Sequence, residues 1–249
     1  MTYIYGRGPV IEALKNKKVD KLYLAASGGS IIKIKAMADE NKVLIARVSK
    51  DKLDKMTEGK NHQGVCALIS GFKYTDFDEL LNDLREKEAA KLLILDKIED
   101  PHNFGAIIRS SLYFAFDAII IPRHGSVLVN DTVYKTSQGA VDSVKISVVN
   151  NLSQAIEKLK KESFWIYACH MNGEDIKDTT FDNKLALIIG NEAKGIAENL
   201  KKHADFIVKI PNYSDFDSLN ASVAAAIVMY EVVRWFTTDV MKKIKITYL

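Results

Sequence analysis

The feature that most constrains the fold is an alternation of short apolar runs with longer helical patterns in the last two-thirds of the chain. The apolar runs have the length of buried strands, and the segments between them carry apolar residues at helical spacing. Strands that alternate with helices pair in parallel and are covered on both faces, so we predict an α/β domain built on a parallel sheet. The predicted strands are KLLILD, DAIIIP, VKISVV, FWIYAC, LALIIG and DFIVKI, and the predicted helices span about 103–115, 130–138, 151–162, 196–203 and 218–241.

A smaller α/β pattern precedes this domain. A helix is predicted over residues 9–15, and the strands KLYLAA, VLIARVS and GVCALIS alternate with the helices SIIKIKAMADE and KDKLDKM. The following segment, GFKYTDFDELLNDLREKEAAK, is charged and amphipathic, with Leu80, Leu81 and Leu84 on one side. The predicted divisions are a first domain over 1–72, a linker with a first helix over 73–90, and a main domain over 91–249.

Composition narrows the class of protein. The chain has 249 residues, 47% of them hydrophobic, and a formal net charge of +3, which permits a nucleic-acid partner without requiring one. Cys66 and Cys169 lie inside apolar runs, and we predict buried free thiols in a reducing cytosol. The five histidines show no metal-site spacing, the first residues do not resemble a signal peptide, and no apolar stretch reaches membrane-spanning length. We therefore expect a cytoplasmic protein without a metal or a membrane segment.

Three polar clusters follow predicted strands of the main domain. They are DPHNFGAIIR, GNEAKG and IPNYSDFDSLN. Because the carboxyl ends of parallel strands meet at one edge of a sheet, we expect all three to gather there, where α/β proteins bind ligands. No GxGxxG follows a strand and no GxxxxGK[ST] is present, which disfavours a dinucleotide-binding fingerprint and a P-loop.

The second and third clusters contain groups suited to a small polar ligand. Gly190 and Gly195 bracket a turn whose backbone can face an adenosine or an amino-acid moiety, and Gly195 can take a positive φ. Ser218 is the predicted N-cap of the last helix, and Asn220 lies with it at the positively polarised helix start. This position favours an anionic or electron-rich group.

The first cluster adds Asn103 and Arg109, which helical spacing places roughly within reach of one pocket. A guanidinium there can clamp a phosphate with two hydrogen bonds. Each residue also has a structural alternative when taken alone. Arg109 fits a surface ion pair, Asn103 and Ser218 fit helix caps, and Glu192 fits a salt bridge in a turn.

Considered together, LDKIEDPHNFGAIIRSS, LIIGNEAKGI and IPNYSDFDSLNASVAAAIVMYE resemble the three motifs of the SpoU, or TrmH-like, RNA 2′-O-ribose methyltransferases, over about 91–235. KTSQGAVDSVKI matches as well, and IYGRGPVIEAL and NHQGVCALIS resemble the substrate domain of the branch that includes the 23S rRNA guanosine methyltransferase. The resemblance implies a trefoil-knotted parallel-sheet methyltransferase domain of SPOUT type, preceded by a small L30e-like α/β domain. It also implies a homodimer whose active site lies near the subunit interface.

The resemblance carries roles over to individual positions. The implied catalytic residues are Asn103, Arg109, Glu192, Ser218 and Asn220, and the positions whose backbone is implied to hold S-adenosylmethionine are Gly190, Ile210 and Leu219. Two departures concern the cofactor loop more than the reaction type. The family usually has IPMxG where this chain has IPNYS, and a glycine where this chain has Ala115 after the first-motif helix.

The implied chemistry fits these residue types. Transfer of a methyl group from a sulfonium to a ribose hydroxyl needs alignment and removal of one proton, and the neutral leaving sulfur needs no acid. Arg109 is predicted to bind the RNA phosphate and to orient the 2′-hydroxyl or receive its proton. We expect an S-adenosylmethionine-dependent enzyme acting on large-subunit ribosomal RNA. The alternatives are a transfer RNA substrate, a non-catalytic RNA-binding ribosome-assembly factor, and a small-molecule enzyme that is active without its first 70 residues.

Overall fold

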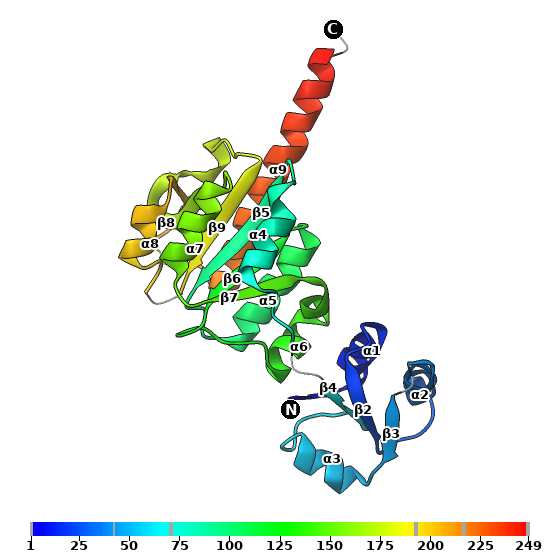
Figure 1. Cartoon of the computed structure of the whole chain (residues 1–249). Coiled ribbons are helices and arrows are strands. Elements are labelled where there is room, and N and C mark those ends of the chain that lie inside the picture. The colour runs from blue at the N-terminus through cyan, green and yellow to red at the C-terminus, as the bar shows by residue number, and fades with distance from the viewer. Residues whose placement is uncertain (1, 42, 70–71, 192–193, 216–217, 248–249) are drawn as a thin grey trace. The chain divides into compact units, whose positions relative to one another are not determined.

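The computed structural model describes residues 2–41, 43–69, 72–191, 194–215 and 218–247 (Figure 1). The chain divides into two compact units. One comprises Met1–Lys73 with Leu128–Ser143, and the other comprises Tyr74–Val127 with Val144–Leu249. In the part of the chain that is described, no helix is both long and apolar enough to cross a membrane.

The first unit is built on a four-stranded sheet of order β1-β4-β2-β3, in which only β2 and β3 run parallel. Its elements are β1 (Thr2–Tyr5), α1 (Arg7–Lys15), β2 (Val19–Leu24), α2 (Ser30–Glu40), β3 (Leu44–Arg47), α3 (Lys50–Met56), β4 (Val65–Ile69), α6 (Asp131–Ser137) and the 3-10 helix η1 (Ala140–Ser143). The strands and helices predicted for the start of the chain are confirmed. The periodicity did not predict β1, because four residues are too few to show a period.

The segment containing α6 and η1 joins the first unit through one buried carboxylate. The side chain of Asp142 is fully buried and forms an ion pair with Lys18. Asn16 Nδ2 and Tyr134 Oη also donate to it, over 3.3 Å and 3.2 Å. A carboxylate removed from water is stabilised when donors surround it in this way. The helix predicted near 130–138 is confirmed as α6, and it groups with the amino-terminal strands.

The second unit contains a six-stranded sheet of order β10-β8-β9-β5-β6-β7. All of its neighbouring strands pair in parallel, so the predicted parallel sheet is confirmed. Its elements are α4 (Phe77–Arg85), β5 (Ala90–Asp96), α5 (Pro101–Tyr113), β6 (Ala118–Pro122), β7 (Lys145–Val149), α7 (Leu152–Lys161), β8 (Trp165–Asp175), the 3-10 helix η2 (Ile176–Asp178), β9 (Lys184–Gly190), α8 (Glu198–His203), β10 (Phe206–Lys209) and α9 (Ala221–Thr247).

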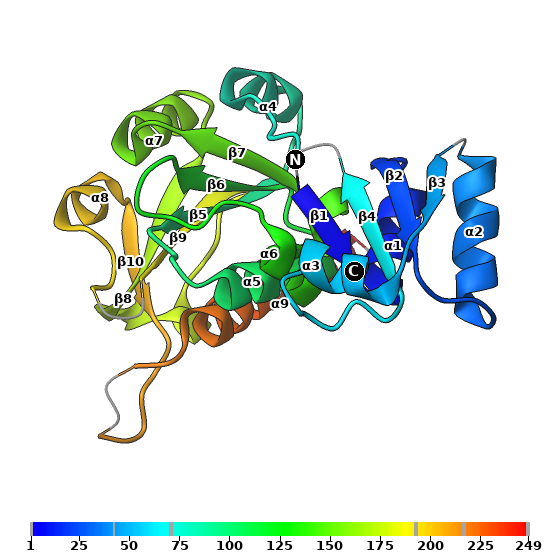
Figure 2. The ribbon, with the colours of Figure 1, turned by 90° about the horizontal axis from the view of Figure 1, so that it is seen from below.

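Helices cover both faces of this sheet. Figure 2 shows α4, α7 and α8 on one face and α5 and α9 on the other. The predicted apolar side of α4, formed by Leu80, Leu81 and Leu84, is buried in one cluster with Leu92 of β5. Leu93, the next residue of β5, points to the opposite face and is also fully buried. Burial on both faces explains why these strands read as continuous apolar runs.

Candidate functional site

The first two polar clusters meet at the carboxyl edge of the six-stranded sheet. β9 lies between β8 and β5, and the last residues of β5 and β9, Asp96 and Gly190, are register partners. The cluster after β5 and the cluster after β9 therefore start side by side, as predicted. The third cluster follows β10, the edge strand, and returns to the same region because α9 packs on α5.

The second cluster is a tight backbone turn. Asn191 N donates to Gly195 O over 3.1 Å, and Gly195 N donates back to Asn191 O over 2.8 Å. Gly195 has the predicted positive φ, 64°. A Cβ on Gly190 would lie only 2.3 Å from the carbonyl carbon of Gly195, so the turn closes over a position that admits no side chain. Glu192, the predicted acid of this cluster, lies outside the described residues.

Asp96 ties this turn to the end of β5. Its carboxylate is 3% exposed, and its Oδ2 accepts a hydrogen bond from Ala197 N over 2.8 Å. Asn191 Nδ2 adds a second link by donating to Lys97 O over 2.9 Å. A role for Asp96 was not predicted from the sequence. The sequence pattern that could indicate one is a lone carboxylate at the end of an otherwise apolar strand, because a buried carboxylate requires hydrogen-bond donors around it.

Asn103 lies inside α5 and faces α9. Asp100 is the N-cap, since its Oδ1 accepts from His102 N over 2.9 Å, and Pro101 occupies the first turn. The alternative that Asn103 is merely a cap is therefore wrong. Its side chain is 9% exposed, and its Oδ1 accepts a hydrogen bond from Asn220 Nδ2 over 2.9 Å. This bond joins the first polar cluster to the third.

Asn220 also caps α9. Its Oδ1 accepts from Ser222 N over 2.9 Å and from Val223 N over 3.3 Å. The prediction that Ser218 is the N-cap is wrong, because α9 begins at Ala221. Asparagine caps as well as serine does, and it has a second polar atom that reaches α5. One side chain thus fixes the start of α9 and positions Asn103.

We expect Asn220→Ala to lower the free energy of unfolding by about 1 kcal/mol through loss of the cap. Asn220→Ser keeps a capping oxygen but removes the amide that bonds Asn103, so its stability is expected to be close to that of the parent. Urea unfolding followed by circular dichroism measures both. Equal destabilisation by alanine and serine would show that the bond to Asn103, and not the cap, holds this end of α9.

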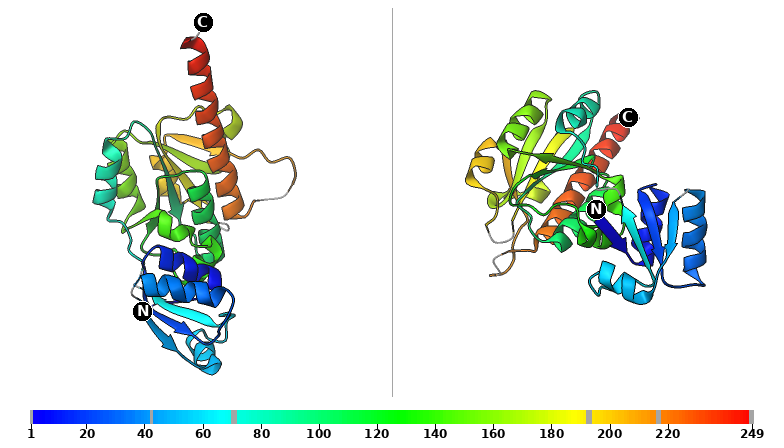
Figure 3. Two further views of the ribbon diagram at one scale, coloured as in Figure 1. Left: turned by 90° about the vertical axis from the view of Figure 1, so that its right-hand side faces the viewer. Right: turned by 60° about the horizontal axis from the view of Figure 1, so that its bottom comes forward.

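Most of the remaining predicted residues are exposed, as Asn220 is. Arg109 follows Asn103 by about 1.7 helical turns, so the two side chains leave α5 in different directions. Arg109 is exposed and makes no hydrogen bond or ion pair among the residues that the structure describes. Ser218 and Leu219 are exposed in the loop before α9, visible in Figure 3, and Ile210 is half-buried directly after β10. The structure joins Asn103 to Asn220 and leaves Arg109 open to a ligand.

The two departures from the family pattern have local structural counterparts. Ala115 has a φ of 52°, a left-handed conformation that glycine adopts without strain. Asn212 Oδ1 accepts hydrogen bonds from both the backbone and the hydroxyl of Ser214, over 3.0 Å and 3.2 Å. This Asx-type turn leaves the side chain of Tyr213, between them, 88% exposed. Ala115 thus has a backbone conformation suited to glycine, and the Asn212–Ser214 bonds shape the loop after β10.

Neither thiol is a suitable nucleophile at neutral pH. Burial raises the pKa of Cys66 to about 12 and that of Cys169 to about 11. Both cysteines are free, as predicted. Cys66 is buried, as predicted, and Cys169 is half-buried. Within the described ranges, no three His, Cys, Asp or Glu side chains converge as metal ligands would. The predicted site residues that the structure describes at this edge offer amides, backbone atoms, a hydroxyl and a guanidinium.

Two family models match the chain. Residues 90–230 match the SpoU rRNA Methylase family, and residues 3–75 match the domain described as RNA 2′-O ribose methyltransferase substrate binding. A TrmH family tRNA/rRNA methyltransferase of Staphylococcus haemolyticus is 38% identical over 236 residues, covering 93% of this chain and 94% of the relative. One of Bacillus subtilis is 37% identical over 237 residues, covering 93% and 95%.

Solved structures show the same fold. The SpoU methyltransferase AviRb of Streptomyces viridochromogenes superposes with a TM-score of 0.80 at 20% identity, covering 93% of this chain and 89% of its own. An rRNA methyltransferase of Sinorhizobium meliloti superposes with a TM-score of 0.77 at 23% identity, covering 94% and 87%. The main unit has the SPOUT-type α/β fold, and the small first unit matches the substrate-binding domain. The chain belongs to the SpoU, or TrmH, family of RNA methyltransferases.

Proposed function

We propose that the protein transfers a methyl group from S-adenosylmethionine to a ribose 2′-hydroxyl of large-subunit ribosomal RNA, in the cytoplasm. The observation that carries this proposal is the hydrogen bond between Asn103 and Asn220, which joins two polar clusters near the turn at Gly190. The family description of residues 3–75 names 2′-O ribose methyltransferases. The two free cysteines accord with a reducing compartment.

The turn at Gly190 fits the methyl donor. Because Gly190 has no side chain and Gly195 folds back onto it, backbone amides and carbonyls are the groups available to a nucleoside there. We assign cofactor binding to the backbone of Gly190, Ile210 and Leu219. AviRb and the Sinorhizobium meliloti enzyme are both described with AdoMet bound, which supports the same cofactor here. S-adenosylmethionine supplies an electrophilic methyl group on a sulfonium.

Arg109 is the residue we propose for binding the RNA. In the described part of the chain its guanidinium has no carboxylate partner, so a phosphate can take two of its hydrogen bonds without displacing one. With S-adenosylmethionine as the methyl donor, Arg109 would orient the 2′-hydroxyl, and the hydroxyl proton would pass to an oxygen of the phosphate that the guanidinium binds. Asn103 and Asn220 would hold the ribose, and Ser218 and Glu192 complete the set of proposed catalytic residues.

We also propose a homodimer, with the active site near the subunit interface. Large apolar side chains are exposed on the neighbouring helices α5 and α9: Leu112 is 41% exposed, Tyr113 82%, Val223 46% and Tyr230 52%. A second copy of the chain would cover such a patch and bring further residues to Arg109. Sedimentation equilibrium measures the oligomeric state. The trefoil knot and the divisions at 1–72, 73–90 and 91–249 stay predictions.

Transfer RNA is the second candidate substrate. The curated relatives are described as tRNA/rRNA methyltransferases, and a neighbour with a TM-score of 0.55 and 23% identity is described in terms of methylation at C/U34 of tRNA. The first unit matches a substrate-binding domain. A separate domain for the substrate favours a large, structured RNA, because proteins recognise folded RNA mostly by its shape. We therefore rank ribosomal RNA first.

Mapping of 2′-O-methyl groups in total RNA from cells with and without the gene tests the substrate. We expect one site in large-subunit ribosomal RNA to lose its methyl group and to regain it when purified protein and S-adenosylmethionine are added. A lost site in transfer RNA instead would establish the second candidate. Unchanged RNA together with no measurable binding of S-adenosylmethionine would leave only a non-catalytic RNA-binding role.

A further inference from the structure

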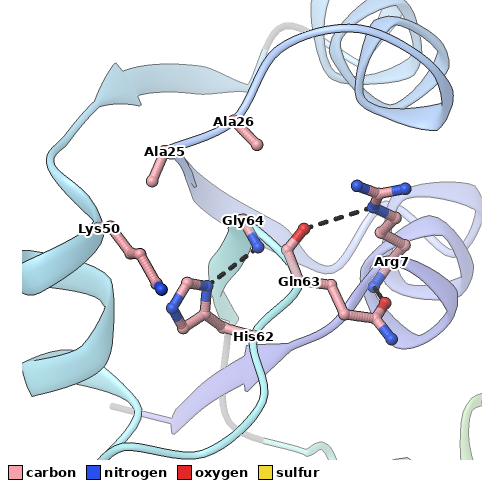
Figure 4. Close-up of a pocket in the computed structure, with 7 residues that line it drawn as sticks. All are labelled: Arg7, Ala25, Ala26, Lys50, His62, Gln63 and Gly64. Atoms are coloured by element: carbon pink, nitrogen blue, oxygen red, sulfur yellow. Dashed lines mark hydrogen bonds between the residues drawn. The ribbon is translucent and has the colours of Figure 1, made fainter.

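The first unit contains a hollow that the proposed chemistry does not use. Its volume is about 570 Å³, and the lining residues are Arg7, Ala25, Ala26, Lys50, His62, Gln63 and Gly64 (Figure 4). Arg7 begins α1 and Lys50 begins α3, and Figure 4 shows them on opposite sides of the hollow. We call this the Arg7–Lys50 pocket. Its size lies within the range of about 300–1,000 Å³ that is typical of small-ligand sites.

Arg7 is held in place entirely by neutral groups. Its Nε donates to Gln63 O over 3.3 Å, and one terminal nitrogen donates to Ser30 Oγ over 3.0 Å. Its backbone N–H donates to Gln63 Oε1 over 3.0 Å. These bonds fix the guanidinium without neutralising it, and its second terminal nitrogen is left for a ligand. A charge that is oriented but not compensated favours an anion.

Lys50 supplies a second positive charge without a partner in the chain. It makes no hydrogen bond or ion pair among the described residues, and it is exposed. Two other lysines of the same unit, Lys18 and Lys60, are paired with Asp142 and Glu58. Arg7 and Lys50 are thus two cations without a carboxylate partner that face one hollow, which points to phosphate as the group bound between them.

His62 lines the pocket and is hydrogen-bonded to the carboxylate of Asp54. Its Nδ1 accepts from Gly64 N over 3.0 Å, so the neutral ring carries its proton on Nε2 and donates it to Asp54 Oδ1 over 3.0 Å. His62 as a whole residue is 5% exposed. Asp54 Oδ1 is thus engaged by His62, and no ion pair joins Asp54 to Lys50 among the described residues.

Small residues form the floor. Gly64 has a φ of 81°, and a Cβ there would lie 2.4 Å from Cβ of Ala26. Gly64 O also accepts from Ala25 N over 3.0 Å. This close approach brings two backbone segments together and leaves only alanine methyl groups above them. Small apolar residues between two cations leave room for a planar base attached to a phosphate.

We propose that the Arg7–Lys50 pocket binds one unpaired nucleotide of the RNA, with its phosphate between Arg7 and Lys50 and its base over Ala25 and Ala26. The inference rests on the proposed function for RNA as the substrate, and it specifies that the first unit recognises a single-stranded segment. Single strands expose base faces and edges that a duplex hides, and a hollow can accept a splayed base.

The test measures the affinity of the full-length protein for a short fluorescein-labelled single-stranded RNA by anisotropy. We expect Arg7→Ala and Lys50→Ala each to raise the Kd about tenfold, the value for one charge-assisted phosphate contact. Each should also lower the slope of log Kd against log salt by about 0.7. Lys35→Ala is the matched control, because Lys35 is an exposed lysine of α2 outside the pocket. We expect less than about a twofold change for it.

Two further comparisons make the outcome decisive. The side chain of Lys50 makes no hydrogen bond or ion pair among the described residues, so Lys50→Ala tests the pocket without breaking an internal bond, and the affinity for S-adenosylmethionine should be unchanged. An RNA duplex of matched length is expected to bind the parent and both variants alike. Equal losses of affinity for duplex and single-stranded RNA would overturn the proposed role of the pocket. A Lys50→Ala variant that binds RNA as tightly as Lys35→Ala does would overturn it as well.

Failure of the pocket and failure of the proposed function give different results. A parent protein that methylates RNA, with pocket variants that bind RNA like the control, rejects the pocket and leaves the methyltransferase in place. A parent that binds single-stranded RNA through the pocket but transfers no methyl group to any RNA rejects the enzymatic proposal and retains the pocket.

Discussion

The Arg109→Ala variant is expected to lose methyl transfer by about 10²- to 10³-fold in single-turnover experiments, the usual cost of removing one group that stabilises charge in a transition state. Arg109 is exposed, so its removal breaks no hydrogen bond or ion pair with another described residue. The Kd for S-adenosylmethionine should therefore stay within about twofold of the parent value, since a residue that binds RNA phosphate contributes nothing to cofactor affinity. Rapid-quench transfer from labelled S-adenosylmethionine, together with calorimetric binding, separates the two quantities.

Arg85 provides the control for loss of a positive charge. It lies on α4, on the face of the sheet opposite α5, and its guanidinium pairs with Glu162 over 2.7 Å. Arg85→Ala should transfer methyl groups at close to the parent rate. Arg109→Lys keeps the positive charge but cannot form a bidentate hydrogen bond to phosphate, so we expect a methyl-transfer rate between those of the parent and Arg109→Ala. Near-normal single-turnover methylation by Arg109→Ala with cofactor bound would contradict the assigned role.

Gly190→Ala is expected to weaken S-adenosylmethionine binding by about 100-fold or more, because the added Cβ has no space. It would lie 2.3 Å from the carbonyl carbon of Gly195 and 2.5 Å from Ile196 N, and both are backbone atoms that cannot rotate away. The turn that bonds Asn191 to Gly195 must then open, and the backbone groups assigned to the cofactor move with it. Isothermal titration calorimetry with S-adenosylmethionine measures the loss.

Gly195→Ala is the matched control for this experiment. Gly195 has a φ of 64°, and nothing lies within 4 Å of the position that a Cβ would occupy there. Alanine at this position costs about 1–2 kcal/mol of backbone strain without a steric collision. We therefore expect Gly195→Ala to lower the thermal midpoint while retaining most cofactor affinity. Equal loss of affinity in both variants would mean that strain in the turn, and not the close approach at Gly190, controls binding.

The elements of the fold were largely predictable because each leaves a local pattern. Apolar runs gave the six strands of the main sheet, and the spacing of Leu80, Leu81 and Leu84 gave the buried side of α4. Strand order was not predictable, since the insertion of β9 between β8 and β5 depends on long-range packing. The placement of α6 with the first unit depends in the same way on the burial of Asp142, which no local pattern records.

The candidate site was predictable in residue type more than in arrangement. The tight turn at Gly195 follows from glycine placement, and the structure has it. The sequence predicts Ser218 as the helix cap where Asn220 is the cap, because both residue types cap well and the contact with Asn103 is not visible in the sequence. That contact spans 117 positions along the chain. Asn103 looked like a cap for the same reason, although Asp100 already fills that role.

Asn220 sets a limit on how the protein can vary. Its oxygen stabilises the first turn of α9 while its nitrogen donates to Asn103. Aspartate and serine would preserve the helix end but lack the amide, and glutamine carries the amide on a longer arm that no longer fits the capping geometry. Selection for thermal stability alone would therefore accept substitutions that lose the bond to Asn103, so stability screens at this position should be followed by an activity assay.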